Sequence, residues 1–209
     1  MTLLSNKRMN LLDVFEPGTF HIDSFDLPNP PDDSDRRNLF VAMDQATRWV
    51  YMRCYRDQLE DGIADFLLRL VKASPMSIQR IAAESHLGID RRSFGVCGSH
   101  SGGQLFDSAC LAMSIDLQTF APFKPTDCGM VERFTRSFYE QVRQVQSITA
   151  DDLVHIVRSY AAAYNHGCQS ALAGSTPMRA VRRWRRKRPE LFLKKGLKMI
   201  DTAPVMHAE

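Results

Sequence analysis

The chain has 209 residues, of which 44% are hydrophobic, and this length can bury the core of one domain of catalytic size. Its five scattered cysteines form no close pairs, which argues against a secreted disulfide framework or a cysteine-based zinc site and favours a reducing, cytoplasmic location. The formal net charge is +3, and no apolar run is long enough to cross a bilayer, so we expect no membrane span.

The N-terminal part of the chain reads as a linker followed by strands. Residues 1–17 show no sustained hydrophobic period and are expected to be a linker or the remnant of something longer. Three runs rich in β-branched and aromatic residues follow at 18–27, 38–44 and 48–55. The second and third runs are separated by a spacing typical of a hairpin. We therefore expect three consecutive antiparallel strands.

Helices and strands alternate in the rest of the chain. The apolar spacing i, i+3, i+4, i+7 predicts amphipathic helices, and Thr176 followed by Pro177 predicts the start of the last one. We expect helices over 60–74, 104–114, 130–145, 150–164 and 176–192, and strands over 77–83 and 115–121. The order of these elements predicts an α/β fold, in which a five-stranded mixed sheet has helices on both faces.

Positive charge is concentrated near the C-terminus. From Arg179 to Lys198 there are ten basic residues and one acid, a net charge of +9, which leaves about −6 for the remainder. Arginine-rich segments commonly bind phosphate backbones, although a solvated helix face is the alternative. The candidate DNA-binding residues in this segment are Arg182, Arg183, Arg185, Arg186, Lys187 and Arg188.

Three acids stand out along the predicted elements. Asp23 lies within the first strand, where an ionised side chain is costly unless a cation or a donor meets it. Glu84 ends the fourth strand-like run, and Glu132 opens a later helix, where an acid also suits the helix dipole. Carboxylates on two strands and one helix can converge on two hard cations, the arrangement used for in-line attack on phosphodiesters.

Several longer segments resemble one family. They are "EPGTFHID", "RRNLFVAMDQATRWVY", "KPTDCGMVERF", "YNHGCQSALAGSTPMRAVRRW" and "KRPELF". From Glu16 to Phe192 the chain resembles the catalytic core of bacterial insertion-sequence transposases, which are related to retroviral integrases. The resemblance implies a ribonuclease H-like fold. It also implies that Asp23 and Glu132 are the first and third of three acids that bind two Mg²⁺ or Mn²⁺ ions.

The sequence departs from the family pattern at two motifs. The family usually has Thr-Asp-Asn-Gly after the fourth strand, but this chain reads "AAESHLG", which places Glu84 at the position of the aspartate. An alternative alignment uses "VCGS" and places Val96 there, without an acid. The sequence "PTDCG" replaces the usual Gln-Thr-Asn-Gly and brings Cys128 near the site. These departures predict weak activity or none.

The resemblance implies a core for metal-dependent DNA strand cleavage and transfer, working as a dimer or higher homo-oligomer. The alternative is a catalytically inactive relative that binds DNA or associates with an active transposase. Only about seventeen residues precede the first expected strand, so we expect the chain to lack the helix-turn-helix domain that usually precedes such a core and to recognise sequence only weakly. Lys124 is a further candidate DNA contact, and His166 is either a structural end-of-helix residue or another such contact.

We expect three parts along the chain. These are a linker or remnant over 1–17, an integrase-like catalytic core over 18–170, and a basic helical C-terminal extension over 171–209.

Overall fold

The computed structural model describes residues 15–27, 37–56, 59–84, 101–120, 125–144 and 149–193. Its strands are β1 (Thr19–Leu27), β2 (Arg37–Asp44), β3 (Val50–Arg56), β4 (Arg80–Glu84) and β5 (Asp116–Phe120). Its helices are α1 (Leu59–Ala73), α2 (Ser101–Ala112), α3 (Pro125–Gln144), α4 (Ala150–His166) and α5 (Pro177–Lys187), with short 3-10 helices η4 (Ser170–Leu172) and η5 (Pro189–Phe192). Every strand and helix that the sequence predicts is present.

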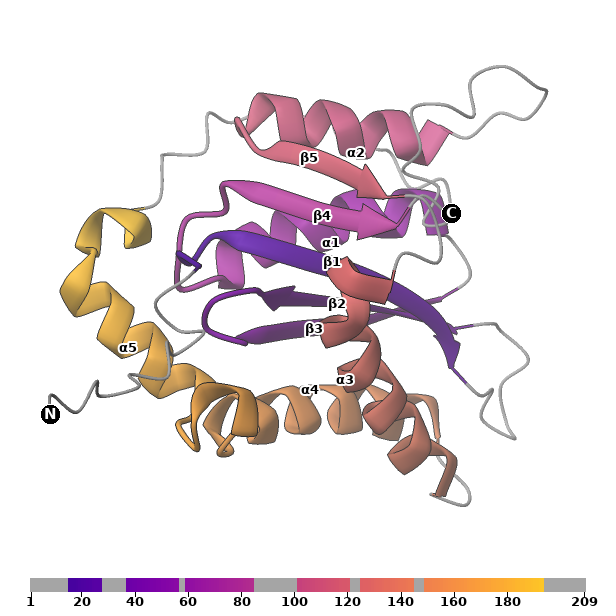
Figure 1. The fold of residues 1–209 in the computed structure, drawn as a ribbon. Coiled ribbons are helices and arrows are strands. Elements are labelled where there is room, and N and C mark those ends of the chain that lie inside the picture. The colour runs from indigo at the N-terminus through magenta and orange to yellow at the C-terminus, as the bar shows by residue number, and fades with distance from the viewer. Residues whose placement is uncertain are drawn as a thin grey trace, which may run out of the picture.

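The five strands form one mixed sheet in the order β3-β2-β1-β4-β5 (Figure 1). β1, β2 and β3 are antiparallel, as predicted, whereas β4 and β5 run parallel to β1. β4 begins at Arg80, three residues later than expected. The reason is that Ser77 hydrogen-bonds elsewhere: its backbone N–H and its hydroxyl donate to the carbonyls of Leu191 and Leu193.

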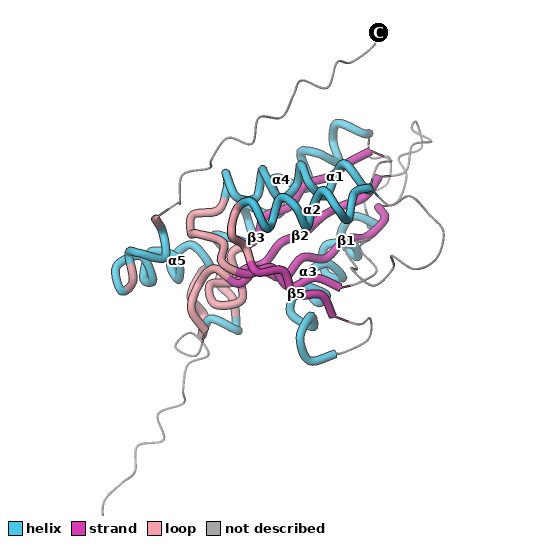
Figure 2. Tube along the Cα trace, turned by 90° about the horizontal axis from the view of Figure 1, so that it is seen from above, coloured by secondary structure: helices cyan, strands magenta, loops and turns pink. Residues whose placement is uncertain are grey.

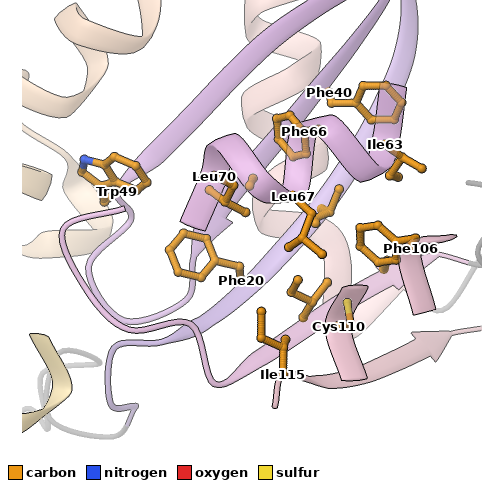
Figure 3. Packing of buried hydrophobic residues seen from close by; sticks show 14 of the residues in the cluster. Phe20, Phe40, Trp49, Ile63, Phe66, Leu67, Leu70, Phe106, Cys110 and Ile115 are labelled. Atoms are coloured by element: carbon orange, nitrogen blue, oxygen red, sulfur yellow. The ribbon is translucent and has the colours of Figure 1, made fainter. Parts of the chain in front are cut away.

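Two hydrophobic clusters cover the two faces of the sheet. One cluster lies between the sheet and α1 and α2, and the other lies between the sheet and α3 and α4. Figure 2 shows α1 and α2 on one side of the strands and α3 on the other. In β1, β2 and β3, residues on alternate faces enter opposite clusters, as the period of a strand requires; in β2, for example, Phe40 enters the first cluster and Val41 the second. In Figure 3 the α1 residues Phe66, Leu67 and Leu70 pack against aromatic and aliphatic residues from the strands and α2.

Helix α3 begins at Pro125, five residues before the predicted start at 130. The prediction that Glu132 opens the helix is therefore wrong, because seven helical residues precede it. The favourable effect of a helix dipole on an acid is confined to the first turn, so it does not account for Glu132. Val131 and Phe134 turn toward the sheet, and Glu132 is left on the exposed side.

Helix α5 starts as the sequence predicts. The Thr176 hydroxyl accepts a hydrogen bond from the backbone N–H of Arg179, and Pro177 occupies the first turn. The helix ends before Pro189, where η5 begins, because a proline ring disfavours the helical conformation of the residue before it. Val181 and Trp184 are buried, and Val181 belongs to the core cluster shared with α1 and α2.

Asn165 fastens α4 to the edge strand β3. Its side chain is buried; Oδ1 accepts from the backbone N–H of Val50 at 2.9 Å, and Nδ2 donates to the Val50 carbonyl at 2.8 Å. The amide thus pairs both backbone groups of Val50, as a neighbouring strand would. No smaller or purely apolar side chain can do this.

We expect Asn165→Ala to lower the free energy of unfolding by about 2 to 4 kcal/mol, because it leaves a buried N–H and a buried C=O without partners. Urea unfolding followed by circular dichroism measures the loss. The control is His166→Ala on the exposed side of the same turn, expected to change stability by no more than about 0.5 kcal/mol. If the two variants unfold at the same urea concentration, the hydrogen bonds from Asn165 to Val50 do not stabilise the fold as proposed.

Candidate functional site

Asp23 and Glu84 are neighbours in the sheet. β1 and β4 pair in parallel with Ile22 opposite Ala83, and Asp23 and Glu84 are the next residues on the two strands. Ile22 and Ala83 face the cluster under α1, so the alternation of β1 directs Asp23 to the opposite face, toward α3. The side chain of Glu84 lies outside the described residues.

The carboxylate of Asp23 is held by donors from β1 and α3. Oδ1 accepts from the Ser24 backbone N–H at 2.9 Å, and Oδ2 lies 3.1 Å from the Thr135 hydroxyl, which can donate to it. Thr135 is only 7% exposed, and its hydroxyl also lies 2.9 Å from the Glu132 carbonyl oxygen. This residue therefore connects the first predicted acid to the helix that carries the third.

Glu132 stands one helical turn before Thr135. Residues three apart on a helix have Cβ atoms roughly 5–6 Å from each other, so Glu132 is close to the place where α3 meets the Asp23 carboxylate. Glu132 is exposed and lines an open hollow of about 450 Å³. The hollow is lined by Phe25, Asp26, Glu132, Thr135, Arg136 and Tyr139. The structure thus brings Asp23 and Glu132 to one region between β1 and α3.

The chemistry of these acids fits a hard divalent cation. Mg²⁺ and Mn²⁺ prefer carboxylate and water oxygens. Glu132 offers such oxygens at an open hollow, and Asp23 contacts Thr135, which lines the same hollow. Among the side chains that the structure describes, no three His, Cys, Asp or Glu groups converge as a metal site. That set does not include the side chain of the third predicted ligand, Glu84.

The basic candidates lie at the other end of the sheet. β4 starts next to Ser77, whose bonds to Leu191 and Leu193 hold η5 there, whereas Glu84 is the last residue of β4. Figure 1 shows α5 at the side where β1 and β4 begin. The predicted DNA-binding arginines therefore lie near the start of β1 and β4, whereas Asp23 is in the middle of β1 and Glu84 is at the end of β4.

The individual basic candidates differ in their surroundings. Arg182, Arg183, Arg185, Arg186 and Lys187 are exposed around the buried stripe of α5. The Arg188 guanidinium instead forms ion pairs with Glu16 and Glu190, which raise its pKa further.

Two further DNA-binding candidates, His166 and Lys124, are not part of α5. The Nδ1 atom of His166 lies 3.0 Å from the Ala162 carbonyl oxygen in the last turn of α4. Lys124 and Val96 lie outside the described residues.

Five residues that line this hollow were not predicted from the sequence, and three of them lie on α3. Thr135, Arg136 and Tyr139 follow Glu132 at i+3, i+4 and i+7, which is the spacing of one helix face. This spacing in the sequence could have identified the three residues as neighbours of Glu132. It could do so only if Glu132 was placed inside a helix and not at the start of one.

Comparison with known proteins supports the fold. No family model and no curated protein matches the chain. A chain in the cryo-electron-microscopy structure of the simian T-cell lymphotropic virus intasome in complex with PP2A regulatory subunit B56 gamma is similar, with a TM-score of 0.58 and 16% identity. The match covers 93% of this chain and 61% of that chain.

The strand order and this likeness define the fold as ribonuclease H-like, with a five-stranded mixed sheet flanked by helices. Within that class, the fold is similar to that of a retroviral intasome chain. In the part of the chain that the structure describes, no helix has the length and apolar character needed to cross a membrane.

Proposed function

We propose that this chain is a transposase- or integrase-type catalytic core that cuts and joins DNA strands with the help of divalent metal ions. The observation that carries the proposal is the hydrogen bond from Thr135 to Asp23, which joins a carboxylate on β1 to the helix that bears Glu132. The intasome likeness supports the same proposal at the level of the fold.

In this proposal, Asp23, Glu84 and Glu132 hold two Mg²⁺ or Mn²⁺ ions. When bound, such ions supply an activated hydroxyl or water nucleophile and stabilise the leaving oxygen of an in-line displacement. Thr135 and the Ser24 N–H fix the orientation of the Asp23 carboxylate, which lowers the reorganisation needed for ligation. Arg136, exposed in the same hollow, is the cation nearest in sequence to Glu132 on that helix face and can meet a phosphate oxygen.

The α5 arginines are the proposed DNA anchor. Six cations lie exposed on one short helix that has no acidic residue, so they repel one another in the free protein. A polyanion relieves this repulsion and releases condensed counterions when it binds. Because α5 lies at the start of β1 and β4, it is proposed to hold DNA at a distance from the reacting phosphate, in a dimer or higher oligomer.

We expect replacement of Arg182, Arg183, Arg185 and Arg186 by Gln to weaken DNA binding and to flatten its salt dependence. The slope of log K against log salt should fall by about 0.9 for each phosphate that the variant no longer neutralises. Fluorescence anisotropy with a labelled duplex at several salt concentrations measures both. The control removes the same charge by changing the exposed Arg69, Arg80, Arg143 and Arg158 to Gln. If the two variants lose the same affinity and the same salt dependence, the net charge of the protein, and not α5, determines DNA binding.

The alternative function is a catalytically inactive relative that binds DNA or joins an active transposase. The departures at Glu84 and Cys128 favour it. A strand-nicking and strand-transfer assay with Mg²⁺ or Mn²⁺ separates the two, with Asp23→Asn as the test of the site. Activity that Asp23→Asn abolishes supports the catalytic proposal. DNA binding without any activity in the unchanged chain supports the alternative.

A further inference from the structure

Arg48 has a backbone conformation that suits glycine. It lies in the β2–β3 hairpin with a φ of +61°, in the left-handed region that residues with a Cβ rarely adopt. Two hydrogen bonds of 2.9 Å fix this turn, one from the Arg48 N–H to the Asp44 carbonyl and one from the Asp44 N–H to the Trp49 carbonyl. Glycine would form the same turn without strain, and strained residues cluster at functional sites. This position therefore indicates a role for the arginine side chain.

The Arg48 side chain is half-buried, and its charge is unpaired. Among the residues that the structure describes, none forms a hydrogen bond or an ion pair with its guanidinium. Burial lowers the pKa of Arg48, Tyr164 and Asp44 raise it, and the charge of Arg133 lowers it further. The Asp44 carboxylate already accepts three hydrogen bonds from other residues. A half-buried charge without a partner is costly, and an anion bound beside it would offset that cost.

Tyr164 brings a hydroxyl donor to the same place. The Asn165 side chain holds the end of α4 against Val50, which is two residues after Arg48. Burial raises the pKa of Tyr164 to about 12, although the nearby charge of Arg48 opposes this rise. The phenol therefore keeps its proton at neutral pH and can donate one hydrogen bond. A neutral donor thus lies near the unpaired guanidinium.

Arg133 of α3 brings a second positive charge to this corner. The next residue, Phe134, meets Tyr164 edge to face with ring centroids 4.7 Å apart, so this turn of α3 lies against the end of α4. Arg133 is exposed, and its Nε–H donates to the Gly129 carbonyl at 2.9 Å, which leaves its two terminal nitrogens for another acceptor. Two guanidinium groups and a phenol from three elements therefore meet at one corner, and this donor set suits an oxyanion such as phosphate.

This corner lies between α5 and the predicted acids. Asp44, at the base of the hairpin, pairs with Phe20 of β1, three residues before Asp23. Three strand residues span about 10 Å. Figure 1 shows α5 at the same side of the sheet, where β1 begins. A DNA strand that is held by α5 and reaches Asp23 would therefore pass the hairpin.

We propose that Arg48, Arg133 and Tyr164 bind one phosphate group of the DNA backbone, separate from the phosphate that reacts. The inference rests on the proposed function. The guanidinium of Arg48 can donate two parallel hydrogen bonds to a phosphate, and the other two side chains can donate to its remaining oxygens. Backbone contacts of this kind fix the register of a strand without reading its sequence. The site would thus set which phosphate reaches the acids.

The test uses the full chain and a labelled duplex in EDTA, and its main variant is Arg48→Gly. Glycine suits a φ of +61°, so this variant should unfold in urea no earlier than the unchanged chain. We expect its DNA affinity to fall about tenfold, the value of one charged hydrogen-bonded contact. The slope of log K against log salt should fall by about 0.9. Arg158→Gln removes the same charge at an exposed position of α4 and should leave both quantities nearly unchanged.

Two further measurements separate the phosphate contact from other causes. Tyr164→Phe removes only the hydroxyl, so it should weaken DNA binding without changing the salt slope. Inorganic phosphate should raise the melting temperature of the unchanged chain above that in chloride of equal ionic strength, and Arg48→Gly should abolish this rise.

If Arg48→Gly and Arg158→Gln bind DNA equally well, the inference is wrong, while DNA binding by the unchanged chain leaves the proposed function intact. Stabilisation by inorganic phosphate without any loss of DNA affinity in Arg48→Gly would assign the corner to free phosphate and overturn the DNA contact. Absence of DNA binding by the unchanged chain overturns both the inference and the proposed function.

Discussion

Replacing Asp44 by alanine is expected to lower the free energy of unfolding by about 3 kcal/mol or more. Asp44 is completely buried at the end of β2. Its carboxylate accepts hydrogen bonds from the Gly18 N–H at 2.8 Å and from the N–H and hydroxyl of Thr47, each at 2.7 Å. Alanine leaves three buried donors unpaired, each costing about 1 to 3 kcal/mol.

These hydrogen bonds join the start of β1 to the β2–β3 hairpin. Gly18 has a φ of +116°, and a Cβ there would lie 2.8 Å from the Ser77 carbonyl oxygen. Residue 18, whose N–H donates to Asp44, therefore has a conformation that suits glycine. Urea unfolding measures the loss for Asp44→Ala. The matched control is Asp26→Ala, an exposed aspartate on β1, expected to stay within about 0.5 kcal/mol of the unchanged chain. Equal losses would contradict a special role for Asp44.

The Asp44 contribution also has a predicted pH dependence. Burial raises the pKa of Asp44 above its ordinary value of 3.8, and the hydrogen bonds from Gly18 and Thr47 oppose this rise. The folded state therefore keeps the proton to a higher pH than the unfolded state. The stabilisation that comes from this difference in the pKa of Asp44 is fully present below pH 3.8. It is lost as the pH rises through the pKa of Asp44 in the folded state.

The stability advantage of the unchanged chain over Asp44→Ala should shrink as the pH rises from about 3.5 through the folded pKa. Unfolding in urea at a series of pH values measures this difference for the two proteins. An advantage that grows with pH would show that the hydrogen bonds to the carboxylate outweigh the effect of burial.

Strand positions could be predicted because the signal is local. In β2 the continuous apolar run from Leu39 to Met43 is typical of a strand buried on both faces, and its residues do enter both clusters. The start of β4 could not be predicted, since it depends on Ser77 bonding to the chain more than a hundred residues later. The start of α3 was missed because prolines suggest a loop, although proline is also favoured in the first turn of a helix.

The site itself was only partly predictable. Asp23 was identified by the family resemblance and by its unusual place within an apolar strand. Its partner Thr135 lies 112 positions further along the chain, and no local pattern links the two. The position of α5 at the far end of the strands follows from the hydrogen bonds between Ser77 and the segment around η5. Charge pattern alone therefore indicated a DNA-binding helix but not its distance from the acids.

Glu84→Asp is expected to raise metal-dependent strand cleavage or joining, up to about a hundredfold, because misplacing a reacting group by about 1 Å can cost that much. Residue 84 follows Ala83, which pairs with Ile22, so it is next to Asp23 across β1 and β4. The transposases that this chain resembles usually have aspartate at this position, one methylene shorter. Labelled DNA incubated with Mg²⁺ or Mn²⁺ and separated on a denaturing gel measures cleaved and joined strands.

The control for this substitution is Glu140→Asp, the same change at an exposed position two turns beyond Glu132 on α3. It should leave activity unchanged, since Glu140 does not line the hollow. If Glu84→Asp stays inactive while the protein remains folded and binds DNA, the binding-only alternative is favoured, because restoring the usual acid did not restore chemistry. Activity that survives Glu84→Ala would show that the middle acid lies elsewhere in the chain, since a proposed two-metal site cannot lose a ligand without loss of rate.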